Sequence, residues 1–336
     1  MATETEQAET VGGDRSGVYT SFVRWMENLT ETQFAYFLLT PALLLLLVIA
    51  VWPLIATFRL SLFADSFIGG ATVGEFVGLQ NYIEIITGER SASLPAPLLP
   101  TSLSMSALFE SALAVTLVFT LASVFFETLI GFGQALVLNQ EFTGRRWVRV
   151  AIIIPWAIPI VIQGMIFFLL FQPDIGLLVG SEGNGILQQL GIMSNTPLAN
   201  AQDSTLIVIV ADIWKTTAFM ALLILAGMQS INRDLYDVAK VAGASPWQRF
   251  KTITLPLILP TVLVAMLFRT IQAMRVYGII ETVSGCTTVP SLSCLVIQSF
   301  FQNSAVGSAA TIAFITAGII AIVVSVYIVG FAREGI

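Results

Sequence analysis

Six long stretches of apolar residues dominate this sequence and leave few structures open to it. They cover about 34–58, 107–138, 148–171, 204–228, 257–281 and 304–332. A helix needs about 20 mostly apolar residues to cross a bilayer, and each stretch reaches that length. Lipid offers no partner for backbone N–H and C=O groups, so a span must be a helix or part of a closed barrel, and none of the stretches alternates as barrel strands do. We therefore predict an all-α membrane protein with six transmembrane helices.

The composition agrees with a protein embedded in lipid and excludes several functions. The 336 residues are 56% hydrophobic and 11% charged, whereas soluble domains carry about 25% charged residues. Lysine and arginine number 15 against 21 acidic residues, a net charge of −6, and no basic stripe suggests a nucleic-acid partner. The chain has no histidine, which removes the usual general base and the commonest transition-metal ligand.

The distribution of lysine and arginine predicts the orientation in the membrane. Loops rich in these residues stay on the cytoplasmic side. The loops after the second and fourth spans are basic, whereas loops 172–203 and 282–303 contain neither residue type. The basic positions are Arg145, Arg146, Arg149, Arg233, Lys240, Arg249 and Lys251. We therefore expect both termini to be cytoplasmic, in a protein of the cell membrane.

The region before the first span has a different character from the rest. Residues 1–20 are polar and acidic, without the basic start and apolar run of a signal peptide, and we expect a disordered cytoplasmic tail there. Residues 21–32 place apolar side chains on one helix face, which favours a short interfacial helix; these are Phe22, Trp25, Met26 and Leu29. Residues 1–32 thus precede a membrane domain that we place at 33–336.

Two features outside the basic loops concern packing. Cys286 and Cys294 fall in a loop that we expect outside the cell, where a disulfide can persist. The sequence leaves open whether they form that disulfide or remain two free thiols; two cysteines alone make no structural zinc site. Small residues crowd 304–313 at the start of the sixth span, which indicates close helix packing, including against a partner subunit.

The loop after the fourth span is patterned as a helix, a glycine and a second helix. Asn232 or Asp234 can cap a helix start. Leu235, Val238, Ala239 and Ala242 then share one face, and Gly243 is placed to end the helix in the left-handed conformation. Ser245 and Pro246 are typical of a second helix start, and Pro256 and Pro260 mark the return to the membrane. Such an element is suited to docking in a groove of another protein.

The segment Asp237-Val-Ala-Lys-Val-Ala-Gly243-Ala resembles the Glu-Ala-Ala loop of ABC importer permeases. Asp237 stands for the glutamate, Val238 for the first alanine, and Ala242 where the sugar-importer subgroup has aspartate. Further segments are similar to sugar permeases of the maltose, glycerol-phosphate and trehalose type, in particular the subunit that pairs with a second, different permease. They are Trp247-Gln-Arg-Phe250, Ile253-Thr-Leu-Pro256, Pro41 and Pro53, Gly78-Leu-Gln-Asn-Tyr82, Pro155-Trp-Ala-Ile-Pro159 and Ala226-Gly-Met-Gln-Ser-Ile231.

This resemblance implies a transport subunit that is not itself an enzyme. It implies a second homologous permease, two copies of an ABC ATPase that bind ATP and Mg, and an extracytoplasmic solute-binding protein. The sequence contains no phosphate-binding P-loop, so nucleotide must bind elsewhere. The residues expected to couple to the ATPase are Leu235, Tyr236, Asp237, Val238, Ala239, Lys240, Gly243, Ala244 and Trp247. The solute implied is a sugar or polyol.

Ionisable residues within the spans are candidates for a substrate pathway, because charge at bilayer depth is costly. In the fourth span one face carries Asp212, Lys215, Thr216 and Phe219, and in the fifth Gln272 and Arg275 are one turn apart. The structural alternative pairs Asp212 with Lys215, and Glu127 with Arg269, as scaffolding. Pro155 and Pro159 predict a kink in the third span, either in a gate or as a plain bend.

Two other classes of function compete with an importer subunit. An ion-coupled secondary transporter would explain the intramembrane charges, but such folds usually contain internal repeats, and the six spans show none. A membrane enzyme would need a metal cluster or a nucleophile with its base, and the sequence contains neither pattern. Copurification with an ATPase and a second permease would separate the three.

Overall fold

The computed structural model describes residues 17–65, 73–90, 93–173, 175–176, 178–180 and 185–333. By its internal contacts the chain divides into two compact units, Met1–Thr57 and Phe58–Ile336. The tail expected at 1–20 lies outside the described residues as far as residue 16, but its last residues already belong to helix α1 (Val18–Glu27).

The described residues of the first unit are mostly helical. After α1 come α2 (Glu31–Leu46), the π-helical turn η1 (Leu47–Val51) and α3 (Trp52–Ser61), whose last residues belong to the second unit; α2, η1 and α3 together form a 31-residue apolar helix. Thr30 caps it, because its hydroxyl accepts from the Gln33 N–H at 3.3 Å while the Gln33 side chain accepts from the Thr30 N–H at 3.1 Å. The Phe22 and Trp25 rings of α1 lie 5.9 and 5.1 Å from Phe37. The location of α1 at the membrane interface stays a prediction.

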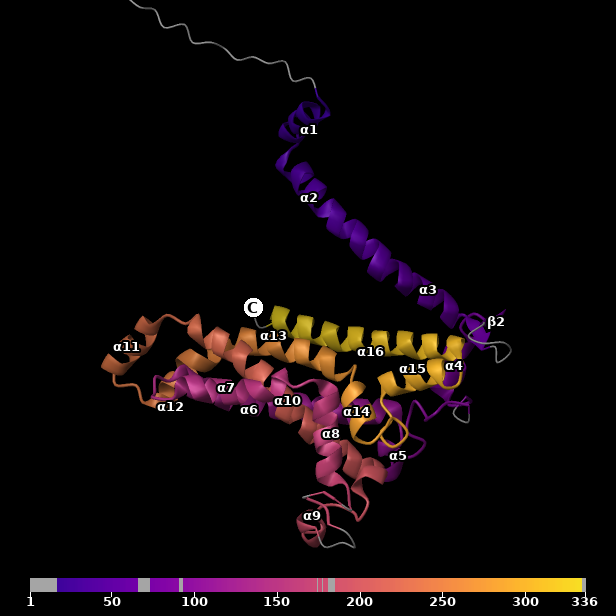
Figure 1. Ribbon diagram of the computed structural model, residues 1–336. Helices are drawn as coiled ribbons and strands as arrows, with labels where there is room; N and C mark the ends of the chain where they lie inside the picture. Colours follow the sequence, from indigo (N-terminus) through magenta and orange to yellow (C-terminus); the bar gives the residue numbers. More distant parts are fainter. Residues whose placement is uncertain are drawn as a thin grey trace, which may run out of the picture. The chain divides into compact units, whose positions relative to one another are not determined.

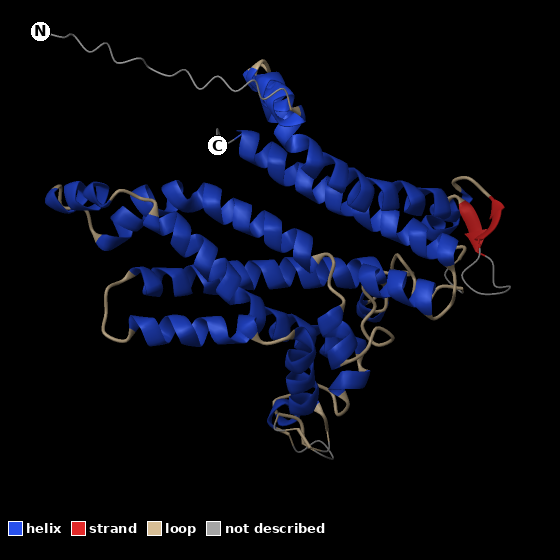
Figure 2. Cartoon of the chain, turned by 45° about the horizontal axis from the view of Figure 1, so that its top comes forward, coloured by secondary structure: helices blue, strands red, loops and turns tan. Residues whose placement is uncertain are grey.

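The second unit contains the long helices α6 (Ala112–Asn139), α10 (Ala201–Gln229), α13 (Leu255–Ala273) and α16 (Val306–Arg333), which lie alongside one another (Figures 1 and 2). Across the described residues, five helices are long and apolar enough to cross a membrane, or six if the bent pair α7 (Arg145–Ala157) and α8 (Ile160–Phe171) is one span. The prediction of an all-α membrane fold is confirmed, with one small sheet added to it.

That sheet pairs β1 (Phe63–Asp65) antiparallel to β2 (Val73–Phe76) and is followed by α4 (Gln80–Thr87). Arg90 connects the parts of this region. It forms ion pairs with Asp65 at 3.2 Å and Glu84 at 2.8 Å, and it donates to the Ser308 hydroxyl at 2.8 Å. Because Ser308 belongs to the first turns of α16, these contacts of Arg90 connect the sheet and α4 to that helix. The small residues 304–313 therefore pack within this chain, where Ala305, Ala309 and Ala310 are buried.

The third span departs furthest from expectation. We predicted one kinked helix over 148–171, but α7 and α8 meet at 91°. Ile158 has extended backbone, with ψ of 130°, and Pro159 follows it. Since proline has no N–H to continue the helical hydrogen bonds, the helix ends there and restarts in a new direction.

The second and fifth spans also differ from the predicted limits. A short helix, α5 (Met105–Phe109), precedes the second span, which starts only at Ala112. The fifth span ends at Ala273 and not near 281, and α14 (Gly278–Val283) follows as a separate helix. Where a loop was expected at 282–303, α15 (Leu292–Phe301) forms, because the Ser291 hydroxyl caps it by accepting from the Cys294 N–H at 3.1 Å.

The short elements gather at the ends of the long helices. Between α8 and α10 lie α9 (Ile186–Gln189) and the 3-10 turn η3 (Pro197–Ala199). Between α10 and α13 lie α11 (Arg233–Val241), α12 (Pro246–Arg249) and the π-helical turn η4 (Phe250–Thr254). In Figure 1, α11 and α12 lie at the left end of the second unit, and α4 and β2 at the right.

Candidate functional site

The element formed by α11 and α12 is built by three local signals in its sequence. The Asn232 side chain accepts from the Asp234 N–H at 3.0 Å, so Asn232, of the two predicted alternatives, caps the helix. Gly243 ends it with φ of +81°, and hydrogen bonds from Gly243 N to Lys240 O and from Ala244 N to Ala239 O close the turn at 3.0 and 2.9 Å. Ser245 then caps α12, with Pro246 in its first turn.

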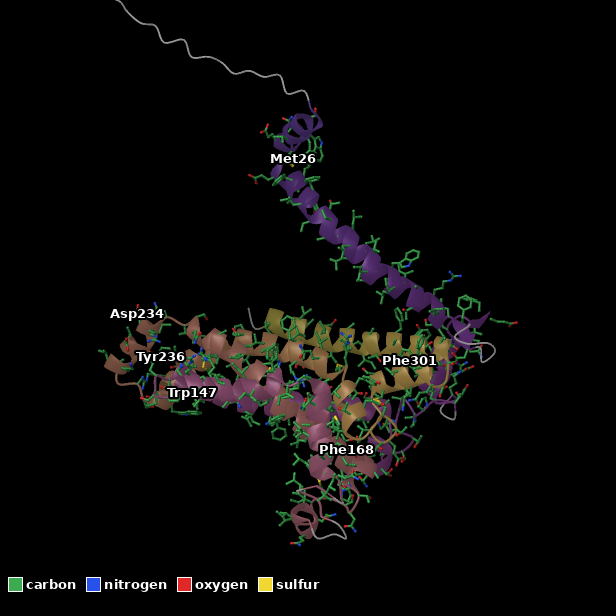
Figure 3. All side chains as sticks on the ribbon, viewed as in Figure 1. Met26, Trp147, Phe168, Asp234, Tyr236 and Phe301 are labelled. Atoms are coloured by element: carbon green, nitrogen blue, oxygen red, sulfur yellow. A yellow bond between two sulfur atoms is a disulfide. The ribbon has the colours of Figure 1, made fainter. Side chains whose placement is uncertain are left out.

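The two faces of α11 differ in burial. Tyr236 packs against a buried apolar cluster contributed by α6, α10 and α13, and its hydroxyl lies 2.9 Å from that of Thr254. Leu235 and Val238 are 46% and 69% exposed, and Trp247 of α12 is 69% exposed. Leu235 and Val238 of the predicted apolar face are therefore open on the described surface, while Tyr236 anchors the helix to the cluster and to η4. Figure 3 shows Asp234 and Tyr236 at the left end of the second unit.

The polar groups of α11 form an exposed ion pair. The Lys240 ammonium donates to the Asp237 carboxylate at 2.9 Å. This hydrogen bond and the lysine's charge lower the pKa of Asp237 from its ordinary value, so the carboxylate is ionised at neutral pH. Ala239, the residue of the predicted apolar face that precedes Lys240, is half-buried.

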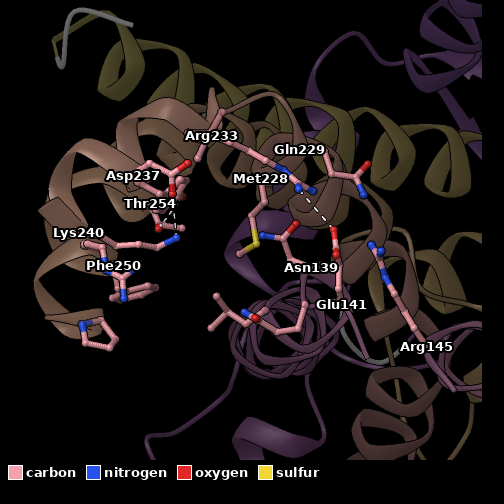
Figure 4. A pocket seen from close by; sticks show the side chains of 16 residues that line it. Asn139, Glu141, Arg145, Met228, Gln229, Arg233, Asp237, Lys240, Phe250 and Thr254 are labelled. Atoms are coloured by element: carbon pink, nitrogen blue, oxygen red, sulfur yellow. Dashed lines mark hydrogen bonds and ion pairs between the residues drawn. The ribbon is translucent and has the colours of Figure 1, made fainter. Parts of the chain in front are cut away.

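A cavity of about 940 Å³ opens beside α11, between the end of α6, the start of α7 and the end of α10 (Figure 4). Arg233 of α11 reaches across it to Glu141 in the α6–α7 turn at 3.4 Å. Arg145 and Arg249 also line it. The two basic loops identified in the sequence thus lie at the same end of the bundle, and Trp147 of α7 lies at this end in Figure 3.

A buried ionic network joins three helices within the apolar part of the bundle. Arg269 of α13 binds Glu127 of α6 through two hydrogen bonds, of 2.5 and 3.0 Å, and also binds Asp212 of α10. The Thr216 hydroxyl donates to Glu127 at 2.5 Å. Glu127, Arg269 and Asp212 are 0, 3 and 9% exposed. The predicted Glu127–Arg269 pair is confirmed, and it includes Asp212 as a third member.

The predicted pairing of Asp212 with Lys215 is wrong. A guanidinium group has five donors and can hold two carboxylates at once, so Arg269 takes the Asp212 carboxylate. The Lys215 ammonium instead donates to the backbone carbonyl oxygens of Trp156, at 3.4 Å, and Ile158. Both carbonyls lie at the break between α7 and α8.

The remaining pathway candidates are more accessible. Gln272, near the end of α13, and Arg275, just beyond it, are exposed, and Phe219 is half-buried on α10 one turn from Lys215. In the described part of the chain, no hydrogen bond or ion pair joins Gln272 or Arg275 to Lys215. The structure thus brings Asp212 and Thr216 into the ionic network and leaves Gln272 and Arg275 exposed on the described surface.

Comparison with known proteins identifies this arrangement. The profile of the family described as binding-protein-dependent transport system inner membrane component matches residues 127–333. The chain belongs to this family. It is a membrane-spanning permease subunit of an ABC-type importer, not an enzyme, and such subunits work with a solute-binding protein, a second permease and ATPase subunits.

Curated relatives extend the match over most of the permease. The trehalose/maltose transport system permease protein MalF of Thermococcus litoralis is 36% identical over 76% of this chain and 78% of its own length. The trehalose transport system permease protein SugA of Mycobacterium tuberculosis is 31% identical over 91% of both chains. A crystal structure of a bacterial alginate ABC transporter has the same fold, with a TM-score of 0.67 at 21% identity, covering 94% of this chain and 98% of its own.

Two structural features of the permease bear on residues that sequence reasoning left open or missed. Cys286, which follows α14, and Cys294, in the first turn of α15, form a disulfide, and both residues are buried. Gln163 of α8 was not singled out, yet it is fully buried and its side-chain amide donates to the Ala211 carbonyl of α10 at 2.5 Å. A lone polar residue in an otherwise apolar span was the signal that could have found it. Within the described residues, no group of three His, Cys, Asp or Glu side chains is arranged to hold a metal ion.

Proposed function

We propose that this permease forms, with a second homologous permease, the pathway for a sugar or polyol. Its relatives carry names of trehalose, maltose and sulfoquinovosyl glycerol transport, and these solutes share several hydroxyl groups around a ring. A polar, hydrogen-bonding wall suits such solutes. Gln272 and Arg275 carry this part of the proposal, because both side chains are exposed, whereas Glu127, Asp212 and Arg269 bind one another and Lys215 binds backbone carbonyls.

We further propose that α11 and α12 dock on the ATPase subunit, which binds ATP and Mg. Leu235, Val238 and Trp247 supply an exposed apolar face, and the Asp237–Lys240 pair supplies polar contacts beside it. The opposite side is fixed through Tyr236, so a force on α11 reaches α10 and η4. The observation that carries this proposal is the combination of an exposed docking face with a rigid anchor.

The permease crosses the cell membrane several times, and we propose that both termini are cytoplasmic. The basic loops around Arg145 and Arg233 share one end of the second unit, which supports a cytoplasmic location for that end. Residues 1–32 then form a cytoplasmic tail and interfacial helix, and 33–336 form the transmembrane permease domain.

Copurification followed by reconstitution tests this function. We expect the tagged permease to bring with it a second permease and an ATPase. In proteoliposomes containing ATP, the complex should take up labelled trehalose or maltose only when the binding protein is present. Uptake without ATP or binding protein would contradict the proposal, as would purification of the permease alone from membranes that contain its partners.

A further inference from the structure

The break between α7 and α8 leaves backbone carbonyls without helical partners inside an apolar span. α7 ends at Ala157, and Pro159 has no N–H with which to continue the ladder. The last carbonyls of a helix have no intrahelical donor, and lipid supplies none. Donors for these oxygens must therefore come from another part of the protein.

Lys215 of α10 supplies them. Its ammonium group donates to the Trp156 and Ile158 oxygens. A cation at this position also interacts favourably with the negative end of the α7 dipole. The Asp212 carboxylate, one turn away on α10, is bound by Arg269. The hydrogen bonds of the Lys215 ammonium therefore go to the carbonyl oxygens at the break and not to Asp212.

Two further contacts fix α8 after the break. The buried Gln163 amide donates to the Ala211 carbonyl, so α8 is bonded to the same part of α10 that carries Lys215. Gly164 lies against α14, where a Cβ atom would fall 1.8 Å from the Thr282 hydroxyl oxygen. The position of α8 thus depends on α10 at one side and on close contact with α14 at the other.

The same α10 helix continues without interruption to the α11 element. Lys215 precedes the last residue of α10, Gln229, by 14 residues, a distance of about 21 Å along the axis at 1.5 Å per residue. Only 230–232 separate α10 from α11, and Ile231 in this connection is buried against the α10 end. A displacement of α11 is therefore expected to move α10, and with it Lys215.

We propose that Lys215 is a positioning residue for transport, which holds α8 at its angle to α7 and makes that angle follow the position of α10. The ammonium group acts on the two carbonyls of the break and need not touch the solute. The part of this inference that concerns ATP rests on the proposed docking of α11, whereas the part that concerns the angle stands on the contacts of Lys215 alone.

Distances between nitroxide labels across the break test the proposal in the assembled complex. Ile154 of α7 and Ile162 of α8 are 53% and 52% exposed, so cysteines placed there can be labelled, while the native cysteines are buried in their disulfide. Without nucleotide, we expect one narrow distance in the parent protein and a broader or shifted distribution in Lys215→Met. Lys215→Arg, which restores a cationic donor, should return most of the narrow population. Uptake by Lys215→Met should fall by about tenfold or more.

Thr217→Val on the same helix is the matched control, because among the described residues the Thr217 hydroxyl bonds only to the Ile213 carbonyl of its own helix. It should leave the label distance unchanged. If Lys215→Met does not assemble, Lys215→Gln replaces it, with the same expectation of a broader distribution. An unaltered distribution in the lysine variants overturns the proposal. Failure of the parent complex to couple ATP hydrolysis to uptake would instead overturn the proposed function.

Discussion

Arg269 is the residue through which three membrane helices meet. Its guanidinium group binds carboxylates from α6 and α10, so one arginine balances two buried acids. Such a network is retained only if every charged group has partners, because desolvation of an unpaired charge is costly. A structural role therefore fits Arg269 better than direct contact with the solute.

Arg269→Met should strongly destabilise the permease. It leaves Glu127 and Asp212 close together without their cation, a loss of about 3–5 kcal/mol for breaking a buried pair. The thermal unfolding of the purified complex in detergent measures this effect. Arg275→Met is the control, since Arg275 is exposed, and should leave the unfolding temperature nearly unchanged. Equal unfolding temperatures for both variants would show that the network does not hold the helices.

Gln272→Ala and Arg275→Ala should lower sugar uptake by about tenfold without preventing assembly. In the proposed pathway each loses hydrogen bonds to a bound solute, which are worth about 0.5–1.5 kcal/mol for the neutral Gln272 amide and about 1.5–3 kcal/mol for the charged Arg275. Uptake is measured in proteoliposomes at several sugar concentrations, with copurified ATPase as the measure of assembly. Normal uptake by an intact complex would remove both residues from the pathway.

Sequence alone could find the charged residues and the Glu127–Arg269 pair, but not the partners of Asp212 and Lys215. The periodicity of α10 places Asp212 and Lys215 on one face, which suggested a pair within that helix. The partner of each side chain instead comes from another segment, Arg269 for Asp212 and the Trp156 carbonyl for Lys215. Such contacts depend on how helices pack and on where a helix breaks, and neither is encoded in local spacing.

At the scale of elements, α11 was the most predictable part of the chain. Its cap, apolar face and terminal glycine are local signals, and all three appear at their expected positions. α15 was missed because its ten residues are too short for a span, and the Ser291 cap was read as part of a loop. The burial of its residues is a tertiary effect that a hydropathy pattern does not contain.

Gly243→Val and Asp237→Lys should each reduce transport. Gly243 has a left-handed backbone, which costs a residue with a side chain about 1–2 kcal/mol, although open space surrounds the position. The strain at Gly243 would change the direction in which the chain leaves α11. The charge reversal at Asp237 would turn its attraction to Lys240 into repulsion. Uptake and ATPase activity of the reconstituted complex are measured side by side.

Gly243→Asn is the conservative control for that experiment, because asparagine tolerates the left-handed conformation. It should transport considerably better than Gly243→Val. If Gly243→Val and Asp237→Lys both transport normally, α11 is only a solvated surface helix and the proposed docking fails.

For the molecule as a whole, the structure gives a geometric check on the orientation deduced from charge. The positive-inside rule concerns loops, and it can be applied only if the basic loops share one side. The Arg233–Glu141 contact joins the two basic loops at one end of the second unit. Arg90 and the start of α16, which it contacts through Ser308, lie at the other end with α4 and β2 (Figure 1). The charge pattern and the helix directions therefore favour the same topology.

Reporter fusions can determine which of these ends faces the cytoplasm. A reporter joined after residue 90 should be active only as an extracytoplasmic enzyme, and one joined after residue 240 only as a cytoplasmic enzyme. Alkaline phosphatase and green fluorescent protein serve as the pair, because the first needs an oxidising compartment for its disulfides. A fusion after residue 303, ahead of α16, should match residue 90, and one after 333 should match residue 240. The reverse pattern would place α11 outside the cell, where no ATPase could reach it, and would remove the basis for both the docking and the coupling through α10.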